Sequence, residues 1–157
     1  MRDPSRGLFG PSPVQIQESY SFAPVLLSIE LWTPHIYISS RKIRFTAHVV
    51  NDRDDGEDLP ASTLHYHLAR AGSSACVVAA TTAPHGMRPQ VKPAAAVIGS
   101  VKYYSTASTV VELSLTSEPP GRYTLCVELA VDGSVIASNE EDVELFSDSI
   151  VGESNSN

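Results

Sequence analysis

The sequence predicts an all-β domain built as an antiparallel β-sandwich of about seven strands. Two segments alternate strictly between apolar and polar residues, Ile43–Val49 and Leu64–Leu68, and this is the period of a half-buried strand. Short runs of this kind follow one another with turn residues between them, which is typical of sandwiches. No window longer than a turn or two has a helical period, so we expect no helix in the core.

Seven segments have the composition and alternation of strands. They are Val25–Leu31, Ile43–Asn51, Ser62–Ala71, Ala75–Thr82, Val110–Thr116, Arg122–Val131 and Ser134–Phe146. A further edge strand is expected within Val97–Tyr104, after a proline-containing loop. The sandwich is predicted to span residues 21–147, with residues 1–20 as a flexible leader or linker remnant and residues 148–157 as a disordered tail.

Two tyrosines and one turn predict that the sandwich is immunoglobulin-like. Asp132-Gly133 separates the last two strands, and glycine accepts the positive φ of a tight hairpin. Tyr123 follows Pro119-Pro120-Gly121 at the start of the sixth strand, where such folds place a tyrosine whose hydroxyl bonds nearby backbone. Tyr66 lies on the apolar face of the third strand, the place of the core aromatic. Both tyrosines are therefore predicted to be structural.

Composition and motifs exclude several kinds of partner. The formal net charge is −7, whereas nucleic acids and anionic membranes bind basic surfaces. No apolar run approaches the ~20 residues of a membrane span, and the N-terminus lacks the apolar region of a signal peptide. There is no P-loop and no dinucleotide-binding fingerprint. We therefore expect no cofactor, nucleic acid or membrane, and assign no compartment.

The two cysteines, Cys76 and Cys126, are predicted to be free thiols. Their separation of 50 residues matches the inter-sheet bridge of antibody domains. On the strand that contains Cys126, however, Leu125 and Val127 occupy the core face, and Cys126 shares the opposite face with Thr124. Since a bridging cysteine is expected to point inward, this pattern favours two free thiols.

An acidic loop, Asp52–Asp58, contains the candidate metal ligands Asp52, Asp54 and Asp58. Clustered carboxylates suit Ca²⁺, which binds oxygen ligands. The spacing falls short of an EF-hand loop, because Gly56 stands at the fifth position from Asp52 rather than the sixth and no glutamate stands at the twelfth. We therefore expect a solvated, self-repelling loop and no metal.

Three histidines would form a zinc site if their strands made a hairpin. His65 and His67 share one face of the third strand, and His48 lies on the second. In an immunoglobulin-like sandwich, however, the second and third strands belong to different sheets. The outward faces of the two strands then point to opposite sides of the domain, so we expect separate surface histidines.

Catalytic and ligand-binding residues give weaker patterns. An Asn-Glu dipeptide such as Asn139-Glu140 marks the acid/base residue in many glycosidases. Here the pair lies within the last strand, and no second carboxylate is predicted about 5–9 Å from Glu140. There is no nucleophile elbow and no cysteine in a catalytic context. Trp32, Tyr37, Tyr103 and Tyr104 are the candidate ligand-binding residues, because sugar-binding modules stack aromatic faces on their ligand.

Three runs of the sequence resemble a single type of domain. They are SYSFAPVLLSIELW (Ser19–Trp32), HVVNDRDDGEDLPASTLHYHL (His48–Leu68) and GRYTLCVELAVDGSVIASNEEDVELF (Gly121–Phe146). Together they resemble the immunoglobulin-like sandwich that follows the catalytic barrel in glycoside hydrolase family 2 enzymes, the β-mannosidase and β-galactosidase-like group. The resemblance covers about residues 19–146, and the stretch Ala83–Ser108 departs from it.

This resemblance implies a non-catalytic accessory domain. In that family the catalytic glutamates lie on the barrel, and this chain has no room for a barrel of ~250 residues, so no catalytic residue carries over. The implied role is to pack against and support the catalytic barrel or a neighbouring domain of a glycoside hydrolase acting on β-mannosides or β-galactosides. The alternatives are a free-standing carbohydrate- or protein-binding module, with a glycan as one ligand, and, ranked last, an enzyme active on its own.

Overall fold

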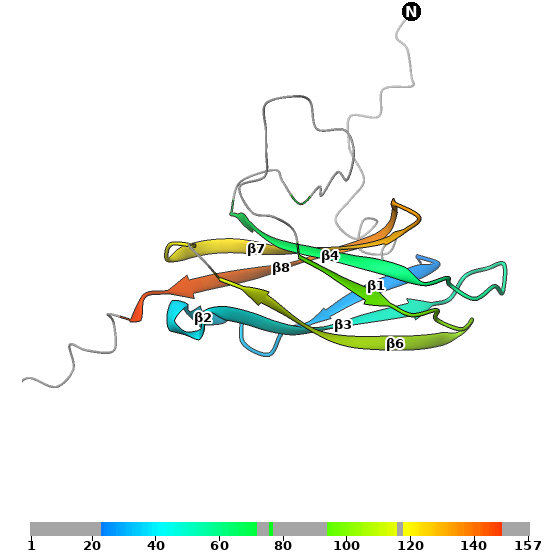
Figure 1. The fold of residues 1–157 in the computed structure, drawn as a ribbon, viewed down its shortest axis with the longest axis horizontal. Coiled ribbons are helices and arrows are strands. Elements are labelled where there is room, and N and C mark those ends of the chain that lie inside the picture. Colours follow the sequence, from blue (N-terminus) through cyan, green and yellow to red (C-terminus); the bar gives the residue numbers. More distant parts are fainter. Residues whose placement is uncertain (1–22, 72–75, 77–93, 116–117, 149–157) are drawn as a thin grey trace, which may run out of the picture.

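The chain folds into two β-sheets that stack face to face (Figure 1). The structure is a computed structural model, and it describes residues 23–71, 76, 94–115 and 118–148. Strands in two layers, with only one 3-10 turn among the described residues, confirm the predicted all-β sandwich. No helix in this part of the chain is long and apolar enough to cross a membrane.

The smaller sheet has three strands in the order β1-β3-β6. They are β1 (Val25–Glu30), β3 (Lys42–Asn51) and β6 (Ser105–Ser114), and both pairs are antiparallel. Along β3 every second residue, from Ile43 to Asn51, is buried, while the residues between are half-buried or exposed. This is the alternation that the sequence predicted, and it turns one face of the sheet to the core.

The larger sheet has five strands in the order β2-β8-β7-β4-β5. They are β2 (His35–Tyr37), β8 (Ser134–Phe146), β7 (Gly121–Val131), β4 (Ser62–Arg70) and β5 (Ala94–Ile98). Only β2 runs parallel to its neighbour. The predicted hairpin joins β7 to β8 at Asp132 and Gly133, whose φ angles of 50° and 80° suit a two-residue turn with positive φ at both positions.

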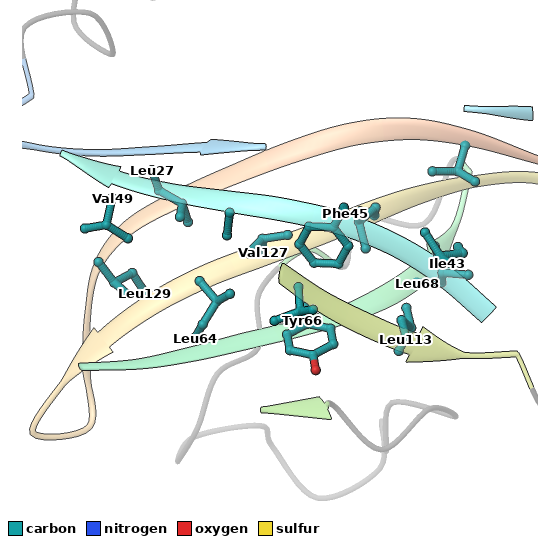
Figure 2. Close-up of a cluster of buried hydrophobic side chains, with 14 of the residues drawn as sticks. Leu27, Ile43, Phe45, Val49, Leu64, Tyr66, Leu68, Leu113, Val127 and Leu129 are labelled. Carbon is teal, nitrogen blue, oxygen red and sulfur yellow. The ribbon is translucent and has the colours of Figure 1, made fainter. Parts of the chain in front are cut away.

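The core lies between the sheets, and β3 and β4 supply its centre (Figure 2). Ile43 and Phe45 of β3 are buried with Leu64 and Tyr66 of β4. The rings of Phe45 and Tyr66 meet edge to face, with centroids 5.6 Å apart and planes at 85°, a favoured arrangement of aromatic pairs. Tyr66 is therefore the core aromatic that the sequence predicted.

Two strands differ from the prediction for a physical reason. β2 was not predicted, because in its three residues only Ile36 is buried, between two exposed neighbours, and so short a segment has no detectable period. β6 begins at Ser105 rather than at the predicted Val110. The residues of its first half on the inward face are small or polar, such as Ala107 and Thr109, so the hydrophobic alternation becomes visible only at Val111.

Two other predictions concern the middle of the chain. The predicted edge strand Val97–Tyr104 is mostly wrong, because the strand observed here is β5 (Ala94–Ile98), and residues 99–104 form no strand. β5 forms one edge of the larger sheet, as expected. The predicted strand Ala75–Thr82 lies outside the described residues except for Cys76, and so do almost all of the predicted leader and tail.

Cys76 and Cys126 form a disulfide, so the prediction of two free thiols is wrong. Cys126 does lie on the face of β7 that points away from the core, since it pairs across the strands with His67 and Glu140. That face is not open to solvent at this position, because Cys126 is only 1% exposed and the neighbouring His67 and Glu128 are buried. The error was to expect a bridging cysteine to point into the core, because this bridge is made on the outer face of the larger sheet.

Tyr123 forms the predicted tyrosine corner. Its side chain is buried, and its hydroxyl donates a hydrogen bond to the Pro119 carbonyl at 2.8 Å. Burial raises the pKa of Tyr123 above its ordinary value; Arg70 lowers that pKa and Glu118 raises it. Burial likewise raises the pKa of Tyr66. Both phenols are therefore held neutral in the folded chain.

We expect the free energy of unfolding to fall as pH rises above about 10. In the unfolded chain these phenols ionise at their ordinary pKa of 10.0, below the folded value, so alkaline pH favours unfolding. Tyr123→Phe should lower stability at neutral pH by about 1 kcal/mol, the net contribution of one hydrogen bond, and should flatten the alkaline loss. Urea unfolding at pH 8 and pH 11 measures both effects. If the free energy of unfolding fell equally between pH 8 and pH 11 in the wild type and the variant, this role of Tyr123 would be contradicted.

Candidate functional site

One side of the sandwich is open, because β1, at the margin of the smaller sheet, does not pair with β8, which β2 covers only along Glu144–Phe146. A groove of about 720 Å³ lies between β1 and β8. Its walls are Ala23 and Val25–Leu27 on the β1 side and Val135–Glu140 on the β8 side. Leu26, Val135 and Ile136 are between 36% and 48% exposed. We call this feature the apolar groove.

The edge of β8 presents backbone hydrogen-bonding groups to this open side. In an antiparallel pair, successive residues direct their N–H and C=O alternately toward the partner strand and away from it. Glu144 N donates to Pro34 O and Glu140 N donates to Asn139 Oδ1, each at 2.8 Å, so these residues face away from β7. Ser138 and Asp142 follow the same alternation. Among the described residues, β2 covers only Glu144–Phe146 of β8, so no strand pairs with Ser138 or Asp142 on that side.

Asn139 links the two strands across the groove. Its Nδ2 donates to Leu27 O at 2.9 Å, while its Oδ1 accepts the bond from Glu140 N. The Nδ2 bond thus holds β8 beside β1, and the Oδ1 bond satisfies an N–H of β8 itself. In the Asn139-Glu140 pair the asparagine therefore has a structural role, which agrees with its expected place in a sandwich strand.

Three neighbouring carboxylates form what we call the acidic edge, Glu140, Glu141 and Asp142. All three are exposed, and no salt bridge among the described residues involves them, whereas Glu144 nearby lies 3.9 Å from Arg122. Glu141 pairs with Leu125 and so points to the inner face of the sheet. Inward-pointing charges on an edge strand are a known device against unwanted strand pairing.

A β-bulge directs Ile136 toward the groove. Leu129 pairs with Ala137 and Ala130 pairs with Val135, which leaves Ile136 as the extra residue of β8. Ile136 lines both the apolar groove and a second hollow of about 540 Å³. The second hollow is also lined by Pro24, Leu59, Pro60 and Val131, and by Arg53, Asp54 and Asp55. The apolar surface therefore continues from β1 and β8 toward the acidic loop.

The acidic loop is anchored by a buried asparagine. Asn51, which is 0% exposed, donates from Nδ2 to Glu57 O and to Val101 O, both at 3.0 Å. Asp52 N donates to Pro24 O. These bonds fix the end of β3 against β1 and the β5–β6 connection.

Of the three carboxylates considered as calcium ligands, only Asp58 has a hydrogen-bond partner among the described residues. Asp58 Oδ1 accepts a bond from Tyr103 N at 2.8 Å, and Asp55 pairs with Arg53. Asp52 and Asp54 are exposed. Nowhere in the described part of the chain do three His, Cys, Asp or Glu side chains come together to hold a metal ion.

The three histidines are divided between the two sheets, as the topology argument predicted, but His67 is buried, so the expectation of a surface position is wrong for this residue. His48 is on β3 in the smaller sheet, and His65 and His67 are on β4 in the larger one. The separation of β3 from β4 is visible in Figure 1, where they belong to opposite layers. The three histidines therefore cannot surround one ion.

His48 instead joins a cross-strand network that the sequence did not reveal. His48 Nδ1 lies 2.7 Å from Ser108 Oγ on β6, and Nε2 lies 3.2 Å from Glu30 Oε2 on β1. These are the residue types of a Ser-His-acid set, which also requires N–H donors for an oxyanion. The backbone of β3 beneath them is committed to β1 and β6, so we assign the network to sheet stability.

The four candidate aromatics lie at opposite ends of the sandwich. Tyr37 of β2 packs near Phe146, with ring centroids 6.2 Å apart, and Trp32 follows the end of β1 and is exposed. Tyr103 and Tyr104 stand beside the acidic loop, with centroids 6.0 Å apart. One continuous platform of four rings is therefore not formed, and only the Tyr103–Tyr104 pair joins two of the candidates.

Comparison with known proteins gives weak likenesses. No family model and no curated protein matches the sequence. A CARDB domain from Pyrococcus furiosus, solved in complex with di-metal ions, is 12% identical with a TM-score of 0.49, over 81% of this chain and 91% of that one. A β-glucosidase from Kluyveromyces marxianus is 10% identical with a TM-score of 0.40, over 80% of this chain and 15% of that one.

A putative β-galactosidase from Bacteroides fragilis is 15% identical with a TM-score of 0.34, over 76% of this chain and 15% of that one. Likenesses of this size add nothing about metals, substrates or partners. The strand order and register described above establish the β-sandwich on their own. Membership of glycoside hydrolase family 2 is not shown by these matches and remains a proposal.

Proposed function

We propose that this chain is a non-catalytic β-sandwich module that packs against a partner protein through its open side. The observation that supports this most is the apolar groove between β1 and β8, which do not pair with each other, with Leu26, Val135 and Ile136 partly exposed along it. Apolar residues gathered at an unpaired edge are typical of interaction surfaces. The outer face of the smaller sheet, by contrast, is mostly polar, as in the Glu30–His48–Ser108 network.

The strand sequences resemble those of the sandwich in glycoside hydrolase family 2 enzymes, and this resemblance makes the catalytic barrel of such an enzyme the proposed partner. The module would then support the barrel without contributing a catalytic residue. The Glu30–His48–Ser108 network lies on the outer face of the smaller sheet, away from the apolar groove. The purified chain should therefore show no turnover of aryl β-mannosides or β-galactosides. Clear turnover that a single carboxylate substitution abolishes would contradict the non-catalytic assignment.

Co-expression with a family 2 β-mannosidase barrel that lacks its own sandwich tests the packing role. We expect this chain to increase the yield of soluble, active barrel, and Ile136→Asp to reduce that yield about tenfold, because a charge would enter the apolar contact. Val110→Asp is the matched control, since Val110 is 54% exposed on the smaller sheet. Equal effects of the two variants, or equal yield without the chain, would contradict the proposed packing.

Glycan binding is a second candidate, favoured by the exposed Tyr103–Tyr104 pair. Tyr104 is 79% exposed and adopts a φ of 55°, which a bulky residue rarely does. If the pair stacks on sugar rings, Tyr104→Ala should weaken binding of mannose or galactose oligosaccharides about tenfold, and Tyr104→Phe should not. Calorimetric titration measures this, and absence of binding by the wild-type chain would remove this candidate.

A further inference from the structure

The open edge of β8 restricts what can pair with it. Its outward-facing backbone groups extend from Ser138 to Asp142, because β2 occupies the edge from Glu144 onward and the bulge at Ile136 interrupts the other end. Within this stretch the N–H of Glu140 already donates to Asn139 Oδ1, so the outward N–H groups open to a new strand are those of Ser138 and Asp142. A strand added here would therefore pair over about five residues, or roughly 17 Å at the rise of an antiparallel strand. That length suits a short extended segment better than a second sheet.

The charge of the acidic edge selects among possible segments. An added strand would place its side chains beside Glu140 and Asp142 on the outer face and beside Glu141 on the inner face. Since none of the three has a salt bridge among the described residues, a segment bearing Lys or Arg gains ion pairs, and an acidic one is repelled. A second copy of this chain paired through β8 would bring the same three carboxylates, so self-pairing is disfavoured.

The other end of the site selects for apolar residues. At Ile136 and Val135 the edge borders the apolar groove, whose opposite wall is Leu26 and Leu27. Side chains of an added strand at this end would enter a space lined mainly by aliphatic groups. Burial of an aliphatic side chain there is favourable by the hydrophobic effect.

We propose that the β8 edge binds an extended, basic segment of a partner protein by strand addition. The segment has apolar residues at the end that fills the groove and Lys or Arg beside the acidic edge. This inference rests on the proposed docking role of the open side, but it goes further, because packing against a barrel needs no added strand. In strand addition, backbone bonds supply affinity and the side-chain sites supply selectivity.

Fluorescence anisotropy with labelled octapeptides tests the proposal on the full chain. The probe is Thr-Val-Thr-Val-Thr-Lys-Lys-Lys, measured also in reversed order, and the matched peptides have Glu in place of Lys. We expect the better lysine peptide to bind at least tenfold more tightly than its glutamate match, and binding to weaken as salt is raised. Equal binding of the lysine and glutamate peptides would overturn the charge selection.

Two variants at one position separate strand pairing from simple charge attraction. Asp142→Asn keeps the outward N–H and removes one charge, whereas Asp142→Pro removes both. We expect the proline variant to bind at least tenfold more weakly than the asparagine variant. A lysine peptide that is N-methylated along its backbone makes the same test without altering the protein. It should bind at least tenfold more weakly than the unmethylated lysine peptide. Equal binding in both comparisons would overturn strand addition.

The remaining outcomes distinguish other occupants and the proposed function itself. Asp132→Asn, in the β7–β8 turn, removes a charge away from the acidic edge and should leave binding unchanged. Sedimentation that showed a dimer dissociated by Asp142→Pro would make a second copy the occupant and overturn the basic segment. If the peptides fail while Ile136→Asp still lowers barrel yield, strand addition is wrong and the packing role stands. If the peptides bind while the barrel test fails, the glycosidase partner is wrong instead.

Discussion

Phe45→Ala is expected to lower the free energy of unfolding by about 3–5 kcal/mol, the usual cost of truncating a buried phenylalanine. Phe45 is 2% exposed, and its ring meets the edge of Tyr66 between the two sheets (Figure 2). The loss removes apolar burial and leaves a cavity, because neither sheet can close over the space without breaking its strand register. Urea unfolding followed by circular dichroism measures the change.

Phe146→Ala is the control for this prediction. Phe146 lies at the end of β8 and is only partly buried, where its ring contacts His35 and Tyr37. We expect its truncation to cost about 1 kcal/mol, as for a partly exposed aromatic pair. A loss at Phe45 no larger than the loss at Phe146 would contradict the position of the core between β3 and β4.

Reducing the Cys76–Cys126 disulfide is expected to lower stability by about 4 kcal/mol. The bridge closes a loop between residues separated by 50 positions, and by the chain-entropy relation a loop of that length restricts the unfolded chain by about this amount. Thermal unfolding with and without dithiothreitol measures the effect. The double variant Cys76→Ala/Cys126→Ala is the control, because its stability should not respond to the reductant. Titration of two free thiols in the native chain would contradict the bridge.

Sequence reasoning succeeded where one residue pattern decides one structural fact. In Ile43–Val49 and Leu64–Leu68 every second residue is apolar, and burial follows that alternation along β3. In β4 the apolar residues are buried as predicted, but His67 between them is buried as well. Tyr123 after Pro119-Pro120-Gly121 gave the tyrosine corner, since the local chain alone brings its hydroxyl to Pro119. The separation of His48 from His65 and His67 also followed, because it depends only on which sheet receives each strand.

Reasoning failed where an outcome depends on what covers a surface. Cys126 was placed on the correct face of its strand, yet that face is buried there, and no periodicity in one strand indicates what lies over it. The Glu30–His48–Ser108 network depends on the register of three strands distant in sequence, which alternation does not specify.

The open side was the part of the site least accessible from sequence. An unpaired edge is a property of strand order, and the order β2-β8-β7-β4-β5 was not predicted. One signal was available: the run Ser134–Phe146 is 13 residues long, longer than any other strand in the described part of the chain, and its centre is acidic on both faces. A long strand with charges on both faces is typical of an edge, because a central strand would bury one of those faces.

Amide hydrogen exchange along β8 tests the central claim, the open edge as a docking surface, most directly. In the free chain we expect the N–H groups of Ser138 and Asp142 to exchange rapidly and those of Asn139 and Glu141 to be protected by β7. Addition of the lysine octapeptide should protect Ser138 and Asp142 selectively. Protection of both groups in the free chain, or unchanged exchange when the peptide is bound, would contradict the account.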